Sequence, residues 1–299
     1  MPDMNILLVI CIALVAGLLM TRLMKVIGLP NVTGYLIIGI ILGPCCFKII
    51  NHTDLDGVFN IITEVALAFI AFSIGVEFKI SSFKRIGKNI FVITLTQALT
   101  TTLLVDAVLI TLALTTDLIP LPVAICLGAI ATATAPAATL MVVRQYKAHG
   151  PVTETLLPVV ALDDAVGLMV FSVSIALAEV FASGTPITFT AIVLEPLLEI
   201  VLSLAIGAAL GFILSLSTKI FKSRANRLTA CIAVVFAGCG ITMIEGLSLS
   251  SLLVCMMIGA IYCNFFKESD VIMEQCDRWT TPLFILFFII SGASLDIFN

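Results

Sequence analysis

Charged residues are scarce in this chain of 299 residues, and their scarcity excludes an ordinary soluble domain. Only 11% of the residues are Asp, Glu, Lys or Arg, whereas a soluble domain has about 25%. Hydrophobic residues make up 61% of the chain, and the mean hydropathy is +1.22. These values predict a protein that lies in a lipid bilayer. The net charge of −4 offers no basic surface, so we expect no nucleic-acid partner.

Sequence motifs of metal proteins, enzymes and ATP-driven pumps are lacking as well. The chain contains two histidines and nine cysteines but no C-x-x-C spacing, so a zinc or redox centre is not expected. We interpret the cysteines as small packing residues in helices. No stretch resembles the phosphate-binding pattern G-x-x-x-x-G-K-S/T, so transport driven by ATP is not expected either. The sequence therefore predicts neither a cofactor nor an enzyme.

Long apolar runs are what the sequence does contain, and they predict an all-α membrane protein. A helix needs about 20 apolar residues to cross the hydrocarbon core of a bilayer. The runs are Met4–Met20, Val32–Ile50, Val58–Val76, Ile90–Leu114, Leu121–Val143, Thr153–Phe181, Ile187–Ser217, Leu228–Ile244, Leu247–Cys263 and Thr281–Phe298. We therefore expect about ten transmembrane helices in a multi-pass protein of the inner (plasma) membrane.

The basic residues are distributed unevenly between the predicted loops. All Lys and Arg residues except Lys48 follow the first, third, fifth, seventh or ninth run. Because Lys and Arg accumulate in cytoplasmic loops, these loops are predicted to be cytoplasmic. The N-terminus is then expected outside the cell, and the tenth run ends on the outer side as well.

Two adjacent aspartates, Asp163 and Asp164, lie in the middle of the sixth apolar run. If this helix enters the membrane at Thr153, the pair lies about 15 Å deep, near the middle of a hydrocarbon core about 30 Å thick. One ionisable group at that depth costs several kcal/mol, and two like charges in a low dielectric resist joint ionisation. We therefore interpret the pair as a site that binds a proton or a cation.

The two carboxylates are expected to have different surroundings. Adjacent side chains on a helix point about 100° apart, so one can face a cation pathway while the other faces a neighbouring helix. The alternative is a structural pair that is buried against internal partners. Basic partners are scarce, because no Lys or Arg lies in the middle of an apolar run. Asp163 therefore has no basic partner in the predicted membrane region.

The fifth run contains the second signal, a Thr-rich stretch around Pro136. Proline removes a backbone hydrogen bond and clashes with the preceding turn, so a break in the helix is predicted near the middle of the membrane. Broken membrane helices are tolerated where the freed backbone groups line a cavity or bind an ion. Thr132 and Thr134 would then lie beside the aspartates as further ligands. The alternative is a simple proline kink with Thr hydroxyls bonded to the backbone.

Two other acids lie in apolar runs. Glu64 lies about one turn into the third run from its predicted outer end, where it either gates an outward cavity or reaches the interface. Asp106 lies in the fourth run beside a Thr-rich stretch, and we interpret it as a hydrogen-bonded structural acid.

These features together resemble the membrane domain of the monovalent cation:proton antiporter superfamily, of the bacterial sodium/proton exchanger type. The resemblance extends over nearly the whole chain. It rests on the stretches Leu29–Pro44, Ala71–Phe78, Thr134–Thr139, Asp163–Asp164 and Pro282–Leu295, whose order and spacing are more specific than any one of them.

The resemblance implies an inverted-repeat fold of about thirteen helices, with a dimerisation domain and a mobile core domain. A homodimer is therefore expected. Residues 1–299 would form one transmembrane exchanger domain that is incomplete at its C-terminus, because about three more helices are implied. A truncated chain is thus expected, and such a fragment need not transport by itself.

The resemblance also implies a function and roles for residues. The family exchanges Na⁺, or Li⁺ or K⁺, for protons by alternating access. Asp164 would be the principal carboxylate that binds either a proton or the cation. Asp163 would be its partner, which in related two-aspartate exchangers pairs with a lysine on a later helix. Thr132, Thr134 and nearby carbonyl groups would line the site.

Two functions of other classes are alternatives. A sodium-coupled symporter of organic anions on the same scaffold would need cationic or amide donors around a cavity, and the apolar runs contain few of them. An intramembrane aspartyl enzyme would need two aspartates on facing helices and a motif such as G-x-G-D. The aspartates here are adjacent and that motif does not occur. A fragment that does not transport is a third alternative.

Overall fold

The computed structural model describes residues 5–51, 55, 57–76, 88–116, 118–183, 194–244, 249–266 and 269–295. The side chains of Asp164 and Pro136 lie outside the described part, although both residues belong to described helices. The described elements are helices, which confirms the predicted all-α class. They are α1 (Ile6–Ile27), α2 (Asn31–Leu42), α4 (Val58–Val76), α6 (Lys88–Thr115), α7 (Leu121–Ile130), α8 (Pro136–Tyr146), α9 (Pro151–Ser183), α10 (Glu195–Ile220), α11 (Arg224–Thr242), α12 (Ser251–Phe265) and α13 (Ser269–Ala293).

Five of these helices are long and apolar enough to cross a membrane, namely α1, α4, α6, α10 and α11. Shorter apolar helices are α2, α7, α12 and the first part of α9. These lengths agree with a multi-pass membrane protein. The number of crossings and the outer position of the N-terminus stay predictions.

Several helix boundaries differ from the predicted runs, and α2 and α13 show two of the physical reasons. Helix α2 ends at Leu42 instead of Ile50, because Pro44 disfavours a helical backbone at the residue before it. Helix α13 begins at Ser269, well before the predicted Thr281. Its first turns are amphipathic and bury only part of their side chains, so a search for continuous apolar runs does not detect them.

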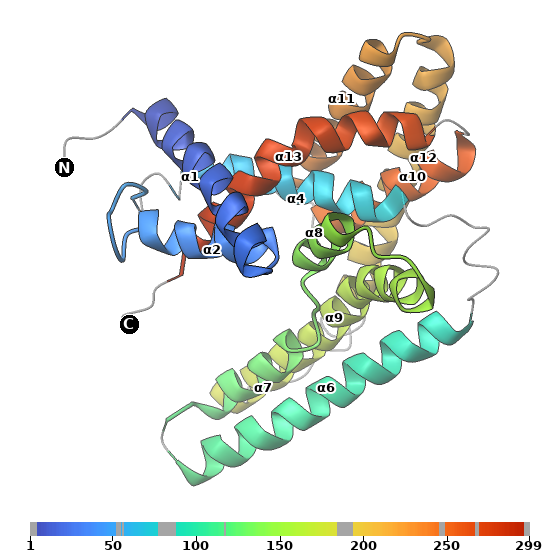
Figure 1. The fold of residues 1–299 in the computed structure, drawn as a ribbon. Coiled ribbons are helices and arrows are strands. Elements are labelled where there is room, and N and C mark those ends of the chain that lie inside the picture. Colours follow the sequence, from blue (N-terminus) through green and yellow to red (C-terminus); the bar gives the residue numbers. More distant parts are fainter. Residues whose placement is uncertain are drawn as a thin grey trace.

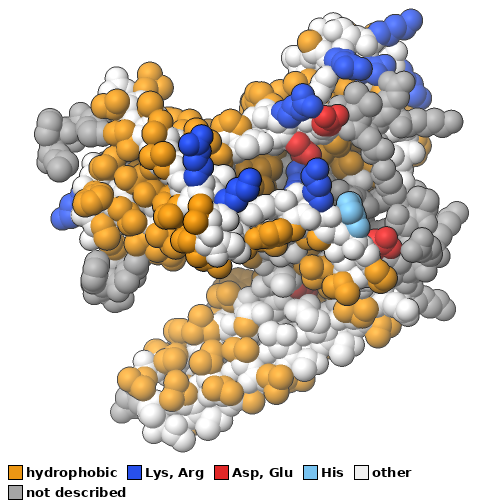
Figure 2. All heavy atoms as spheres, in the orientation of Figure 1, with side chains coloured by type: hydrophobic (Ala, Val, Ile, Leu, Met, Phe, Trp, Pro, Cys, Tyr) orange, Lys and Arg blue, Asp and Glu red, His pale blue; other side chains and the backbone are white. Residues whose placement is uncertain are grey.

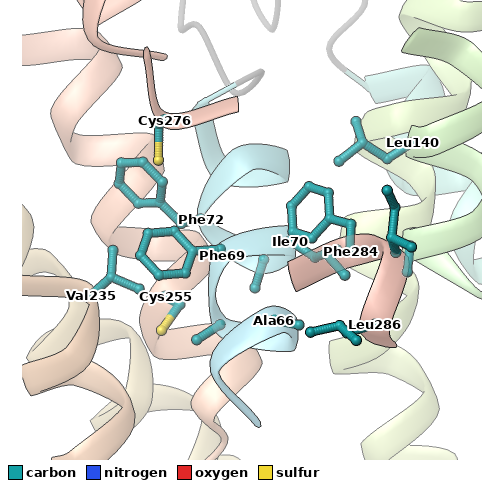
Figure 3. Close-up of a cluster of buried hydrophobic side chains, with 14 of the residues drawn as sticks. Ala66, Phe69, Ile70, Phe72, Leu140, Val235, Cys255, Cys276, Phe284 and Leu286 are labelled. Atoms are coloured by element: carbon teal, nitrogen blue, oxygen red, sulfur yellow. The ribbon is translucent and has the colours of Figure 1, made fainter. Parts of the chain in front are cut away.

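Helix α4 is the centre of the larger of two groups of helices. It packs against α12, α13 and α11. Figure 3 shows Phe69 and Phe72 of α4 among side chains from these neighbours, and both rings are fully buried. At Gly75 the backbones of α4 and α12 approach so closely that a Cβ would overlap the Met256 carbonyl. This group contains α1, α2, α4 and α10 to α13, and we call it the large group.

Helices α6, α7 and α9 form the second group, which we call the small group. Figure 1 shows them as an elongated bundle beside the rest of the molecule, with α8 between this bundle and α4. Gly128 of α7 lies against Asp106 of α6, where a Cβ would overlap the carboxylate. Leu103 and Val108 are exposed on α6, and Figure 2 shows many hydrophobic side chains over this bundle. Such a surface fits contact with lipid.

Candidate functional site

The predicted fifth helix is interrupted between α7 and α8. Helix α7 ends at Ile130 and α8 begins at Pro136, and the residues between them are not helical. Pro136 is the first residue of α8, where its missing N–H and its fixed backbone angle fit the first turn of a helix. The hydroxyl of Thr132 donates to the Ala129 carbonyl at 2.7 Å and so caps the end of α7. The break therefore brings the ends of two helices together between the groups.

Asp163 of α9 lies directly beside this break. Its side chain is fully buried. The Thr134 hydroxyl donates to Asp163 Oδ2, and the Thr134 backbone amide is a second donor to the same carboxylate. Thr134 precedes the N-terminus of α8, where the helix dipole favours a negative charge. The Asp163 carboxylate thus accepts hydrogen bonds from neutral groups and lies near a helix N-terminus that favours its negative charge.

Gln97 of α6 is the third member of this arrangement. Its side-chain amide lies between the Asp163 carboxylate and the Thr132 carbonyl. In one orientation the amide nitrogen donates to the Thr132 carbonyl at 3.3 Å. In the other it donates to Asp163, at 3.0 Å from Oδ1 and 3.3 Å from Oδ2. The two orientations place a donor or an acceptor against the carboxylate.

Sequence reasoning missed Gln97, although the sequence contained a signal. It is the one amide side chain in the predicted run Ile90–Leu114, and a polar group at that depth needs a partner. Its position relative to Asp163 depends on the packing of α6 against α9, which the sequence does not give.

Gly167 of α9 follows Asp163 by one turn and brings the helix close to the break. A Cβ at Gly167 would lie 3.2 Å from the Thr132 hydroxyl oxygen. Beside them is a cavity of about 360 Å³ that is also lined by Ala133, Phe171 and Leu253. Thr132 thus lies both in the break and at the wall of a cavity.

The other predicted site residues are placed as follows. Asp164 follows Asp163 on α9, but its side chain lies outside the described residues. Pro136 defines the start of α8, as described above. Glu64 lies on α4, partly buried and within electrostatic reach of Cys239 of α11. The described contacts of Glu64 therefore place it against the large group and not with Asp163.

Asp106 is not the hydrogen-bonded acid that the sequence predicted. Its Oδ1 atom is buried and has no hydrogen-bond partner in the described structure. The Thr-rich stretch does not supply one, because the Thr102 hydroxyl donates to the Ala98 carbonyl of its own helix at 2.9 Å. In a helix a Thr hydroxyl readily bonds to the carbonyl four residues earlier, and this local bond competes with a bond to the acid.

The described residues contain no group of three or more His, Cys, Asp or Glu side chains that could hold a metal ion. The site around Asp163 therefore consists of one described carboxylate and neutral oxygen and nitrogen atoms. Oxygen atoms of this kind suit alkali cations better than they suit transition metals, because transition metals prefer nitrogen and sulphur ligands.

The comparisons with known proteins agree with this architecture. The family model described as "Sodium/hydrogen exchanger, transmembrane" matches residues 10–299. Among solved structures, the chain is similar to the sodium proton antiporter MjNhaP1 from Methanocaldococcus jannaschii at pH 8, with a TM-score of 0.71. The two chains are 20% identical, and the match covers 98% of this chain and 72% of that chain. No curated protein matches this chain significantly.

The similarity to the solved structure shows the fold of this chain, and the match to the family model shows the family to which the chain belongs. Together they confirm the antiporter-like architecture and the family that the sequence motifs resemble. Because the model extends over nearly all of the sequence, this chain belongs to the sodium/hydrogen exchanger transmembrane family, and is a membrane antiporter rather than an enzyme.

Proposed function

We propose that this chain exchanges a monovalent cation for protons at a site formed by Asp163, Asp164 and the break between α7 and α8. Na⁺ is the cation that we expect first, with Li⁺ and K⁺ as alternatives. The observation that carries the proposal is the full burial of the Asp163 side chain beside neutral donors from α6 and the break. The family supports cation/proton antiport in general, and the residues and the cation are our inference.

Exchange follows from the cost of a buried charge. A carboxylate that is removed from water is stable only if a proton or a cation neutralises it, or if several groups hydrogen-bond to it. A proton and a cation cannot both occupy the same oxygen atoms of Asp163. Each one therefore displaces the other, and this competition couples their movements across the membrane.

Gln97 can satisfy Asp163 in each of these states. When Asp163 is ionised and empty, the Gln97 amide nitrogen donates to it. When Asp163 is protonated, the carboxyl hydrogen can donate to the Gln97 oxygen. When a cation is bound, that same oxygen is a ligand beside the carboxylate. A rotation of one amide group therefore lets the same Gln97 side chain serve the empty, the protonated and the cation-bound state of Asp163.

Thr132 and Thr134 complete the proposed ligands. The Thr132 carbonyl faces the Gln97 amide, and the Thr134 hydroxyl has an oxygen lone pair beside Asp163. Backbone carbonyl and hydroxyl oxygens replace the water shell of a small cation. Asp164, the next residue of α9, is the second carboxylate of the proposal.

Alternating access would occur by movement of the small group against the large group. The contacts of α8 support this proposal, because α8 packs against α9 of the small group and against α2 and α4 of the large group. We also propose a homodimer and a location in the inner (plasma) membrane. Both follow from the family resemblance.

A direct test is the release of protons when Na⁺ is added to the purified chain in weakly buffered detergent solution. We expect Na⁺ to release protons from the wild-type chain, and Li⁺ and K⁺ titrations to rank the cations. Asp163→Asn and Asp164→Asn should each abolish the release, because each removes a carboxylate that exchanges its proton.

The matched control is Asp106→Asn, which removes another carboxylate from the same bundle of helices. This variant should keep the Na⁺-dependent release, because Asp106 lies outside the group around Asp163. If both Asp163→Asn and Asp164→Asn released protons like the wild type, the proposed site would be wrong.

A further inference from the structure

The end of α8 that is farther from the break carries two polar contacts to other helices. Arg144 Nη1 donates to Asp277 Oδ1 of α13 at 2.6 Å. The Gln145 side-chain oxygen accepts a hydrogen bond from the backbone amide of Asn31 at 2.9 Å. Asn31 is the first residue of α2, so Gln145 satisfies one of the free amide groups of that helix end.

Both contacts join α8 to the large group. Helices α2 and α13 pack closely against each other, and neither belongs to the bundle of α6, α7 and α9. At the opposite end of α8, Thr134 is bonded to Asp163 of α9. Helix α8 is therefore fixed to the small group at the break and to the large group at its far end, and Figure 1 shows it between them.

The Arg144–Asp277 pair is only partly accessible to solvent. The side chains are 27% and 38% exposed, whereas the other described ion pair of α13, between Arg278 and Glu274, is 77% and 67% exposed. Arg144 lies in the last turn of α8, where a positive charge interacts favourably with the helix dipole. The pair can therefore hold the C-terminal end of α8 to α13. Because both side chains are partly exposed, water can solvate both charges when the pair separates.

A cavity of about 770 Å³ lies beside these contacts. Its lining includes Asn31, Gln145, Arg144 and Asp277 themselves, together with charged or titratable groups at Tyr35, Lys147, His149 and Glu154. Open space next to a contact between two groups of helices leaves room for the contact to separate. In Figure 2, Lys and Arg side chains gather in the middle of this face.

We propose that the Arg144–Asp277 ion pair, together with the Gln145–Asn31 hydrogen bond, is a latch that holds α8 to α2 and α13 and opens when the small group moves. This inference rests on the proposed antiport, because the movement is the one that exchange requires. The latch stabilises the conformation seen here relative to the other conformations of the cycle. In this proposal Arg144 and Asp277 are positioning residues, because neither of them contacts the proposed ion site.

The expected effect of the latch is modest. Partly exposed ion pairs contribute little, and removing one shifts an equilibrium by about twofold to fivefold. Both Asp277→Asn and Arg144→Gln remove the pair. They should shift the Na⁺ concentration for half-maximal proton release in the same direction and by a similar factor. The double variant Arg144→Asp/Asp277→Arg restores opposite charges and should return the value toward the wild type.

A second readout does not depend on ion binding. Hydrogen exchange at the backbone amides of the last turn of α8 should become about twofold to fivefold faster in each single variant, and slower again in the double variant. Glu274→Gln is the matched control, because it removes the exposed ion pair one turn earlier on α13. It should leave both readouts unchanged.

The outcomes separate the latch from the proposed function. If the wild-type chain released no protons on addition of Na⁺, the proposed function would be refuted, and hydrogen exchange would still test the contact. If the single variants resembled Glu274→Gln in both readouts, there is no latch. Single variants that change while the charge-reversed variant does not recover would also overturn it, because the effect would then not depend on the pair.

Discussion

Replacing Thr134 by valine tests the closest contact of the site. Valine has nearly the shape of threonine but lacks the hydroxyl group that donates to Asp163 Oδ2. A hydrogen bond to a charged group contributes about 1.5–3 kcal/mol. The Thr134 backbone amide and Gln97 remain as donors, so we expect a loss near the lower value. Each 1.4 kcal/mol corresponds to about a factor of ten in an equilibrium constant.

The ionised form of Asp163, which we propose as the form that binds Na⁺, should therefore become less favourable. We expect the Na⁺ concentration for half-maximal proton release to rise about tenfold in Thr134→Val at a fixed pH. Thr134→Ser keeps a hydroxyl group at the same place and should stay within about twofold of the wild type. The thermal midpoint of each variant, measured in the same detergent, shows whether the fold is retained.

One result would refute this reasoning directly. If Thr134→Val folds normally and its half-maximal Na⁺ concentration equals that of the wild type, the hydroxyl contributes nothing to the ionised state. Asp163 would then not be the carboxylate whose proton Na⁺ displaces. A loss of the same size in both variants would point to backbone geometry at the break instead of the hydroxyl group.

Three further predictions concern other parts of the molecule. Gln97→Leu removes an amide that meets Asp163 in every proposed state, so Na⁺-dependent proton release should weaken by about tenfold or more, while Gln97→Asn should keep part of it. Gly75→Val should lower the thermal midpoint by several degrees, because its side chain overlaps the Met256 carbonyl, and a midpoint equal to the wild type would contradict this packing. Burial raises the pKa of Asp277 although Arg144 opposes the shift, so ionising this acid costs more in the folded chain than in the unfolded chain. The stability that this gives is present below the unfolded pKa of about 3.9 and is lost as pH rises through the raised pKa. Thermal midpoints from pH 4 upward should therefore fall more for the wild type than for Asp277→Asn.

The sequence predicted the parts of the site that depend on a single helix. An acid pair in an apolar run is costly wherever that run packs, so Asp163 could be identified without a structure. A proline in a Thr-rich run interrupts the helix for local reasons, and the break before Pro136 lies in the predicted stretch. The all-α class follows from composition in the same way.

The parts that the sequence could not give depend on contacts between helices. Gln97 meets Asp163 only because α6 packs against α9. Asp277 was expected in a loop, and the amphipathic start of α13 brings it to Arg144 instead. The partner of Asp106 was predicted from Thr residues nearby in sequence, but the Thr102 hydroxyl bonds to its own helix. Sequence proximity is a poor guide to which polar groups meet in a bundle.

The neutral donors around Asp163 also bear on the roles of the two aspartates. Family resemblance assigns Asp164 as the principal carboxylate and Asp163 as the partner of a lysine. In the described structure the donors to Asp163 come from Thr134 and Gln97, which hold the carboxylate without cancelling its charge. A lysine would cancel that charge, and a cation would then have to displace it. A buried carboxylate with neutral donors keeps its full attraction for Na⁺, so Asp163 is suited to bind the ion itself.

The two roles predict different results in the proton-release assay. If Asp163 is a ligand, Asp163→Asn abolishes the response to Na⁺ as completely as Asp164→Asn does. If it only holds a lysine, Asp163→Asn keeps a Na⁺-dependent release that Asp164→Asn lacks.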